Sequence, residues 1–191
     1  MGRPPAGKPV ARPITAKYLQ NAAMFYLERY SASAEGVRRV LQRRVRKARR
    51  LEAPVMDDVE GAIEATVQKL IDVGLIDDRQ FAQTKARALH RRGTSARFTR
   101  QKLQVAGVDS ETVQSALAAL GSELGADAVE REWQAAVALA RRRRLGPFRL
   151  AEQRALRRAK DLAAMARAGF AFDVARKVID AAGPDALDED S

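Results

Sequence analysis

The apolar residues of this chain recur with the period of an α-helix from Thr15 almost to the end. They stand three and four positions apart in each segment, whereas the strict alternation of apolar and polar residues that marks a half-buried strand never persists. Glycines, prolines and helix-starting Ser, Thr or Asp residues divide this pattern into about nine segments. The expected starts include Thr15, Ser33, Asp57-Asp58, Thr94-Ser95 and Asp109. The sequence therefore predicts an all-α protein without a sheet.

One break in the pattern, between residues 74 and 82, carries its own stop and start signals. Gly74 can take the left-handed conformation that closes a helix, and Asp77 can accept hydrogen bonds from the first amides of the next helix. Leu75 and Ile76 lie between these signals, and we expect both to be buried. Together with Phe81, they are predicted to be structural residues that fix the angle between neighbouring repeats.

Internal similarity indicates a repeated helical unit. An offset of 62 residues places Ser33 on Ser95, and a further offset of 76 places Gly93 on Gly169. A helical hairpin cannot bury its apolar face alone, so we expect an elongated array of tandem three-helix repeats, with a single irregular bundle as the alternative. The predicted divisions are a disordered basic arm (1–13), a first helical repeat (14–57), a central helical repeat (58–122), a third helical repeat (123–182) and an acidic tail (183–191).

Further expectations concern two single residues and the last two helices. Trp133 lies at the spacing of a core residue, whereas His90, the single histidine, is expected on a helix surface. The last helix is expected to be capped by Asp173. The helix before it is expected to bury a stripe of small and apolar side chains. That stripe comprises Ala155, Ala159, Leu162, Ala163 and Ala166.

Positive charge is concentrated in the N-terminal third. The chain has 35 Lys and Arg residues against 24 Asp and Glu residues, a formal net charge of +11, and residues 1–56 hold 13 of the basic residues but only 3 of the acidic ones. Two further stretches, 85–102 and 141–160, are also locally basic. Polyanions or an acidic protein surface are the natural partners of such faces. The alternative is that these helix faces are simply solvated.

The residue types that catalysis and metal binding require are scarce. The absence of cysteine and the single histidine exclude a thiolate site, a disulfide framework and a histidine cluster. Adjacent acids at 57–58 and 77–78 are read as helix caps, because a hard-cation site needs several converging oxygens. No Ser/His/acid arrangement is supported, and no Gly-rich phosphate loop follows a strand. We therefore expect neither an enzyme nor a cofactor nor a metal site.

Two other classes of protein are also disfavoured. No apolar run approaches the roughly 20 residues needed to span a bilayer, and the N-terminus lacks the apolar core of a signal peptide, so we expect a soluble cytoplasmic protein without a membrane partner. Residues 103–113 have the spacing of a helix-turn-helix. However, the recognition helix would be residues 110–120, which contain no Lys or Arg, and this disfavours sequence-specific DNA reading.

Three stretches resemble the RecX family of regulatory proteins. The segment Leu70–Ala82, followed by Gly93, Leu103, Gly107-Val108 and Val113, is similar to the central repeat of that family. The stretch 26–31 resembles its first unit, and 165–170 resembles its third. One departure lies at Gly36-Val37, where the family usually has a Glu-Leu pair.

The resemblance implies a non-enzymatic all-α protein that binds the RecA recombinase filament. Such a protein would inhibit or modulate strand exchange and the coupled ATPase in recombination, DNA repair and the SOS response. It would also bind single- and double-stranded DNA weakly and independently of sequence, and we expect a monomer. One alternative is a nucleic-acid-binding helical repeat protein without a recombinase partner, and another is a scaffold for a different acidic protein.

The family offers no catalytic residue to carry over, so the binding residues are predicted from charge. Our hypothesis is that two basic groups form the surface that faces RecA or DNA, and that a third is a further candidate. The first two groups are Arg38, Arg39, Arg43, Arg46 and Arg50, and Arg91, Arg92, Arg97, Arg100 and Lys102; the third is Arg141, Arg142, Arg143 and Arg144.

Overall fold

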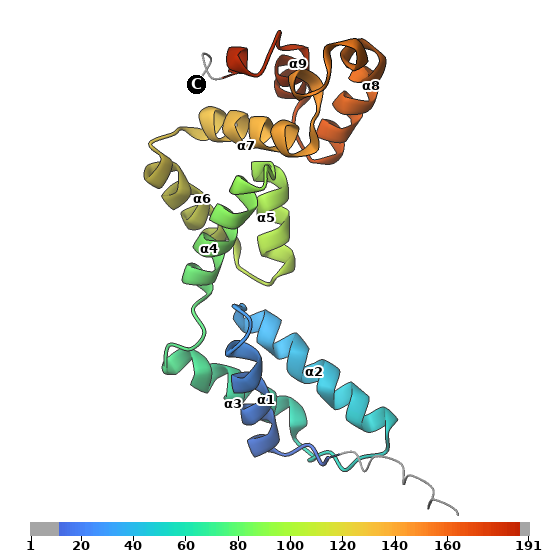
Figure 1. Cartoon of the computed structure of the whole chain (residues 1–191). Coiled ribbons are helices and arrows are strands. Elements are labelled where there is room, and N and C mark those ends of the chain that lie inside the picture. Colours follow the sequence, from blue (N-terminus) through green and yellow to red (C-terminus); the bar gives the residue numbers. More distant parts are fainter. Residues whose placement is uncertain (1–11, 188–191) are drawn as a thin grey trace, which may run out of the picture. The chain divides into compact units, whose positions relative to one another are not determined.

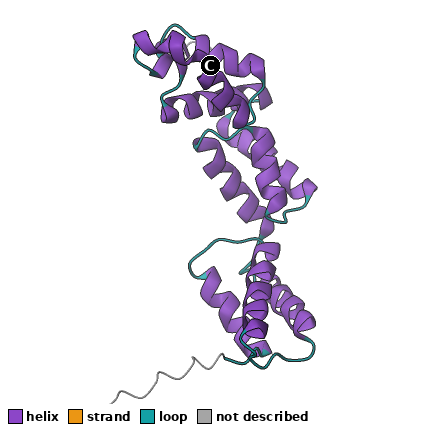
Figure 2. Ribbon diagram, turned by 90° about the vertical axis from the view of Figure 1, so that its right-hand side faces the viewer, coloured by secondary structure: helices purple, strands orange, loops and turns teal. Residues whose placement is uncertain are grey.

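The computed structural model describes residues 12–187, and within them the chain is helical (Figure 1). The nine α-helices are α1 (Ala16–Leu27), α2 (Ala34–Arg50), α3 (Val59–Asp72), α4 (Asp78–Arg91), α5 (Ala96–Val105), α6 (Ser110–Leu124), α7 (Ala128–Arg143), α8 (Ala151–Arg167) and α9 (Phe172–Asp180). Two short 3-10 helices are η1 (Gly146–Phe148) and η2 (Asp185–Leu187). Figure 2 shows helices and loops without a strand in this part of the chain, apart from one isolated bridge between Ile14 and Val55. The predicted all-α fold is confirmed.

Most of the predicted helix starts are confirmed by hydrogen bonds. A side-chain oxygen at the N-cap accepts a bond from a backbone amide three residues later, which satisfies one of the free donors of the first turn. This arrangement occurs at Thr15, Ser33, Asp58, Ser95 and Asp109. The prediction for the last helix is wrong. Helix α9 follows Ala171 without a side-chain cap, and Asp173 lies inside its first turn.

Helices α1, α2 and α3 pack around one core within a compact unit that ends at Asp78. Leu19 of α1, Leu41 of α2 and Ile63 of α3 are fully buried there. The predicted boundary at residue 57 therefore does not coincide with the packing, because α3 shares its apolar face with the two helices before it. Of the predicted arm, residues 1–11 lie outside the described residues.

The break after α3 has the predicted stop signal. Gly74 has φ +73°, and the amides of Gly74 and Leu75 donate to the carbonyls of Ile71 and Leu70. Ile76 is 3% exposed in the core of the first unit, but Leu75 is 54% exposed, so the expectation that Leu75 is buried is wrong. Of this adjacent pair, only Ile76 therefore faces the core.

One of the two acids that start α4 also bonds to the start of α2, a contact that was not predicted. Asp77 directly precedes α4, and Asp78 is the first residue of that helix. A carboxylate oxygen of Asp78 accepts a hydrogen bond of 2.8 Å from the amide of Ala34, at the start of α2. Phe81, one turn further along α4, packs against the core of the second unit. The residues of the break thus belong to two separate cores.

The exposure of Leu75 leads to a prediction. Leu75→Asp should change the free energy of unfolding by no more than about 0.5 kcal/mol, because a surface substitution away from caps and cores has little effect. Thermal unfolding followed by circular dichroism would measure it. A decrease of several kcal/mol would show that Leu75 packs against apolar groups after all.

The second compact unit, from Arg79 onward, contains α4 to α9. One cluster of buried residues forms among α4, α5 and α6, and another among α7, α8 and α9. Direct bonds join these two groups of helices. A carboxylate oxygen of Glu132 on α7 accepts from the amide of Ala96 at the start of α5 (2.8 Å), and the hydroxyl of Ser95 donates to the carbonyl of Ala168 (2.9 Å).

The structure changes the alignment of the repeats. Gly107 lies between α5 and α6, and Gly169 lies between α8 and α9, so these two glycines correspond and are again 62 positions apart. The predicted pairing of Gly93 with Gly169 compares a break after a first helix with a break after a second one. At the new offset, buried residues match buried residues: Leu103 with Met165, Val108 with Phe170, Val113 with Ala175 and Ala116 with Val178. We therefore propose α1–α3, α4–α6 and α7–α9 as the three repeats.

Helix α8 buries a different face from the predicted one. Its buried residues are Asp161, Ala164 and Met165. Of the predicted stripe, Leu162 is half-buried. The alanines at 155, 159, 163 and 166 are exposed. The reason is a polar contact that apolar spacing cannot reveal. The Asp161 carboxylate accepts a bond from the amide of Gly146 (2.9 Å) and two from the guanidinium of Arg149 (2.7 Å each).

The end of the described chain is also packed. Leu187 in η2 is buried in the core of the third repeat, so the predicted acidic tail does not begin as a free segment. Arg154 on α8 donates to the carbonyls of Pro147 and Ala182, and this holds the start of η1 and the segment after α9 against α8. Residues 188–191 of the predicted tail lie outside the described part.

Candidate polyanion-binding surface

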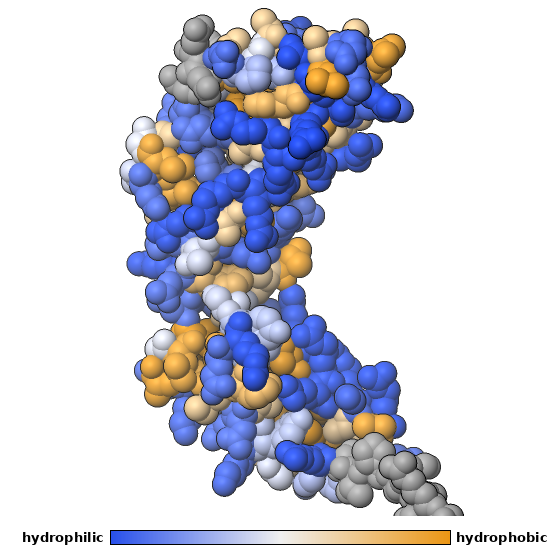
Figure 3. All heavy atoms as spheres, in the orientation of Figure 1, coloured by the Kyte–Doolittle hydropathy of each residue, from blue (hydrophilic) through white to orange (hydrophobic). Residues whose placement is uncertain are grey.

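Helix α2 separates apolar and basic residues onto opposite faces. Val37, Leu41 and Val45 are buried against α1 and α3. The helix carries eight Arg and Lys residues and one acid, so its outer face is strongly basic. In Figure 3 the surface over α2 is coloured hydrophilic. The sequence prediction of a basic face on this helix is confirmed, but its charges are not equivalent.

The first half of α2 uses its arginines for structure. Arg38 forms ion pairs with Glu35 (2.7 Å) and with Glu64 of α3 (2.6 Å), and Arg39 pairs with Glu35 (2.7 Å). Hydrogen bonds from Arg38 hold the pKa of both carboxyls below their usual value, although partial burial opposes this shift. The charges of Arg38 and Arg39 are therefore largely balanced within the first unit.

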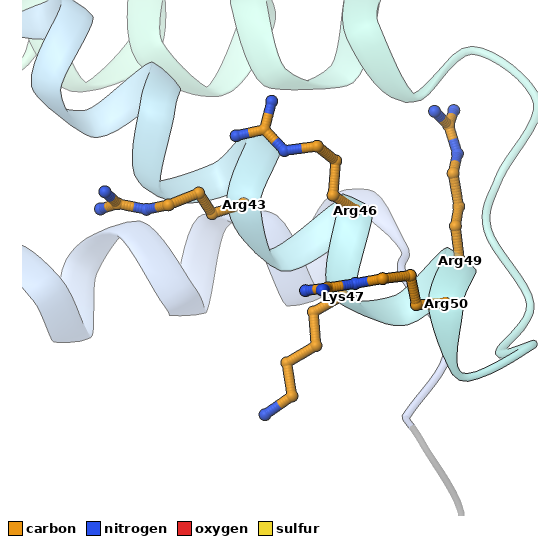
Figure 4. A pocket seen from close by; sticks show the side chains of 5 residues that line it. All are labelled: Arg43, Arg46, Lys47, Arg49 and Arg50. Atoms are coloured by element: carbon orange, nitrogen blue, oxygen red, sulfur yellow. The ribbon is translucent and has the colours of Figure 1, made fainter.

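A cavity of about 620 Å³ lies over the second half of α2, and all the residues between 12 and 187 that line it are cations. We call its lining residues the α2 basic cluster: Arg43, Arg46, Lys47, Arg49 and Arg50 (Figure 4). All five side chains are exposed. A concave surface with one sign of charge concentrates the field, so it would attract the phosphates of a nucleic acid or the carboxylates of an acidic protein.

Sequence reasoning missed two members of this cluster, Lys47 and Arg49. The signal for Lys47 was present, because residues 43, 46, 47 and 50 follow the i, i+3, i+4, i+7 spacing of one helix face. Arg49 lies beside that stripe, in the last turn of α2, and only the structure places it in the cavity wall. Arg44 is half-buried and donates to the hydroxyl of Tyr18 (3.4 Å), so it belongs to the packing instead.

The second predicted basic group lies in the other compact unit. Arg91 ends α4, Arg92 follows it, and the remaining members are on α5. All five side chains are exposed: Arg91, Arg92, Arg97, Arg100 and Lys102. Helix α5 buries Thr99 and Leu103 on its other face. This group gives the second unit a basic face of its own.

The third predicted group ends α7. Arg141, Arg142, Arg143 and Arg144 are exposed at the C-terminus of that helix. Cations at this position interact favourably with the helix dipole, which is a structural reason for part of the run. The guanidinium carbon of Arg141 lies 5.5 Å from the ring centroid of Phe148, and Arg144 lines a second cavity.

Trp133 and His90 both lie in packed positions. Trp133 is buried in the core of the third repeat, as predicted. His90 lies on α4 and is half-buried, so it is at the helix surface only in part. Burial lowers the pKa of His90, and the nearby charge of Arg131 lowers it further, although a hydrogen bond with Gln134 opposes both. Among residues 12–187, no three His, Asp or Glu side chains lie close enough together to hold a metal ion.

The described helices and surfaces define a class: a helical repeat protein with exposed basic faces on both of its compact units. None of the described helices is long and apolar enough to cross a membrane. The family model for the second three-helix domain of RecX matches residues 77–117, which contain the second part of the break (77–82), α4, α5 and the first half of α6.

Comparisons with known proteins identify the family. The chain is 41% identical over 170 residues to regulatory protein RecX of Myxococcus xanthus (strain DK1622), which covers 88% of each sequence. It is 30% identical over 178 residues to regulatory protein RecX of Agrobacterium fabrum (strain C58 / ATCC 33970), which covers 93% of this chain and 89% of that one. This chain therefore belongs to the RecX family, and the resemblance noted in the sequence is confirmed.

Solved structures agree on the fold. A crystal structure of regulatory protein RecX superposes with a TM-score of 0.55 at 19% identity, covering 87% of this chain and 72% of that one. The crystal structure of RecX from Lactobacillus salivarius gives a TM-score of 0.53 at 23% identity and covers 86% of this chain and 94% of that one. At these identities the likeness concerns the fold alone.

Proposed function

We propose that this protein binds the RecA recombinase filament and its DNA, and that it inhibits strand exchange and the coupled ATPase in recombination, DNA repair and the SOS response. The observation that carries the proposal is the α2 basic cluster, five exposed cations around one cavity, in a chain of the RecX family. The protein would act as a cytoplasmic monomer, by binding and not by catalysis, and without a cofactor.

A RecA filament on DNA presents the kind of surface that this cluster suits. Phosphates of the bound DNA and acidic side chains of the recombinase both attract clustered guanidinium groups, which bind such oxygens through two parallel hydrogen bonds. The members of the α2 basic cluster differ in this respect from Arg38 and Arg39, whose charges are already paired with Glu35 and Glu64. The binding role therefore falls on the second half of α2.

Reversal of the cluster tests the proposal. The triple variant Arg43→Glu, Arg46→Glu and Arg50→Glu should need roughly tenfold more protein for half-inhibition of ATP hydrolysis by preformed RecA filaments, because reversed charges repel a polyanionic partner. Its affinity for naked DNA should also fall. The slope of log affinity against log salt should become shallower by roughly 0.7 to 0.9 for each phosphate that the variant no longer binds.

A matched control has the same change in net charge elsewhere. Lys17→Glu, Lys69→Glu and Arg79→Glu alter three exposed cations outside the cluster. This control should inhibit the ATPase like the wild type, and equally weakened inhibition by both triple variants would refute a specific role for α2. A wild-type protein that binds naked DNA but leaves the ATPase unchanged would favour the alternative of a nucleic-acid-binding protein without a recombinase partner.

A further inference from the structure

A second cavity, of about 610 Å³, lies in the third repeat where the chain passes from α7 through η1 to α8. Its walls include Arg144 at the end of α7, Pro147 and Phe148 of η1, and Leu150 and Gln153 at the start of α8. The volume is in the range of small-molecule sites, and the walls combine an aromatic ring with cations. This cavity is separate from the α2 basic cluster that carries the proposed function.

The backbone of Arg144 is in a conformation that favours glycine. Arg144 has φ +52° and ψ +54° and ends α7, and its amide donates to the carbonyl of Arg141. Five other helices of this chain end on a left-handed glycine: Gly74, Gly93, Gly107, Gly125 and Gly169. At such a position an arginine makes the fold less stable than a glycine would. Its side chain, which lines the cavity, therefore comes at a cost to the fold.

The other two guanidinium groups in the cavity wall have structural partners. Arg149 is held by Asp161, and Arg154 donates to the carbonyls of Arg149, Pro147 and Ala182. The Arg144 guanidinium is exposed and has no hydrogen-bond or ion-pair partner among residues 12–187. It is thus the cation in this wall that a ligand can use.

We propose that this cavity binds an unpaired nucleotide of a single strand, with the base against the ring of Phe148 and a phosphate on Arg144. Phe148 is half-buried and lines the cavity, and the guanidinium carbon of Arg141 lies 5.5 Å from its ring centroid. Base stacking on an aromatic side chain needs an unstacked base, which a duplex does not offer. The inference rests on the proposed contact with nucleic acid and deepens it, because it gives the second unit a site selective for single strands.

The test uses the full chain, fluorescently labelled oligothymidine of about 20 nucleotides and a duplex of equal length, with anisotropy as the readout. Phe148→Leu keeps an apolar wall but removes the ring, so affinity for oligothymidine should fall roughly five- to tenfold while duplex binding is unchanged. Arg144→Gly should weaken oligothymidine binding and make the salt slope shallower by roughly 0.7. It should also raise the Tm, because glycine relieves the left-handed backbone.

Arg142→Ala is the matched control, since it removes one exposed cation of the same run outside the cavity. It should bind oligothymidine more tightly than Arg144→Gly does. The inference is overturned if Arg144→Gly and Phe148→Leu bind oligothymidine like the wild type, or if they weaken duplex and single-strand binding equally. It is also overturned if the wild type binds no oligothymidine. ATPase inhibition of RecA filaments that persists in these cases would leave the proposed function standing.

Discussion

Gly93→Ala is expected to lower the free energy of unfolding by about 3 kcal/mol or more, or to prevent folding. Gly93 lies between α4 and α5 with φ +69°. A methyl group there would collide with the backbone amide of Leu139 on α7, and it would stand 2.6 Å from the Cα of that residue and 2.7 Å from the carbonyl oxygen of Ala135. Backbone atoms inside a helix cannot move aside as a flexible side chain can.

Gly74→Ala is the matched control, and urea unfolding of both variants gives the comparison. Gly74 has nearly the same backbone conformation, φ +73°, but a methyl group there would meet no atom within 4 Å. Its replacement should cost only about 1 kcal/mol, the cost of a left-handed alanine. Equal destabilisation of the two variants would contradict the close approach of the α4–α5 turn to α7.

The packing at Gly93 has a functional consequence. Together with the bonds from Ala96 to Glu132 and from Ser95 to Ala168, it joins the second and third repeats into one compact unit. Burial raises the pKa of Glu132, and the hydrogen bond from Ala96 offsets part of that effect. The basic face of α5 and the cavity at Phe148 are therefore carried by a single unit.

Features set by neighbouring residues could be predicted from the sequence. A cap needs only an oxygen and an amide three residues away, which is why Ser33, Ser95 and Asp109 were identified correctly. The stop at Gly74 follows from the same kind of local rule. The absence of a sheet in the described residues follows from apolar spacing, and the number of helices follows from that spacing together with the stop and start residues.

Features set by distant residues could not be predicted. Glu64 lies 26 positions from Arg38, so the sequence shows the local pairing of Arg38 and Arg39 with Glu35 but not the second counter-ion that α3 supplies. The inner face of α8 is another example. Alanines and arginines cover most of that helix and give a weak apolar pattern, and the buried position of Asp161 depends on Arg149, 12 positions earlier. The aromatic wall at Phe148 likewise arises only when α7, η1 and α8 meet.

Asp161→Ala is expected to lower the free energy of unfolding by about 3 kcal/mol. The carboxylate is buried and accepts three hydrogen bonds, one from the amide of Gly146 and two from Arg149. Its removal leaves the buried amide without an acceptor and Arg149 without its counter-ion. Asp161→Asn should lower the free energy of unfolding by less, because its carbonyl oxygen can still accept one of these bonds.

Asp180→Asn is the matched control. It breaks the exposed pair with Arg158 and should cost less than about 1 kcal/mol.

The pH dependence separates the charge of Asp161 from its packing. Burial alone would raise the pKa of Asp161, but the bonds from Arg149 and Gly146 outweigh it, so the pKa lies below the ordinary value of 3.8. A carboxyl group with a depressed pKa stabilises the fold above its unfolded pKa, and this contribution disappears as the pH falls through the folded value. The difference in stability between wild type and Asp161→Asn should therefore be constant near neutral pH and shrink below about pH 4. Urea unfolding between about pH 2.5 and pH 7 would measure it, and a difference that stays constant to the lowest pH would show that Asp161 contributes through its shape and not through its charge.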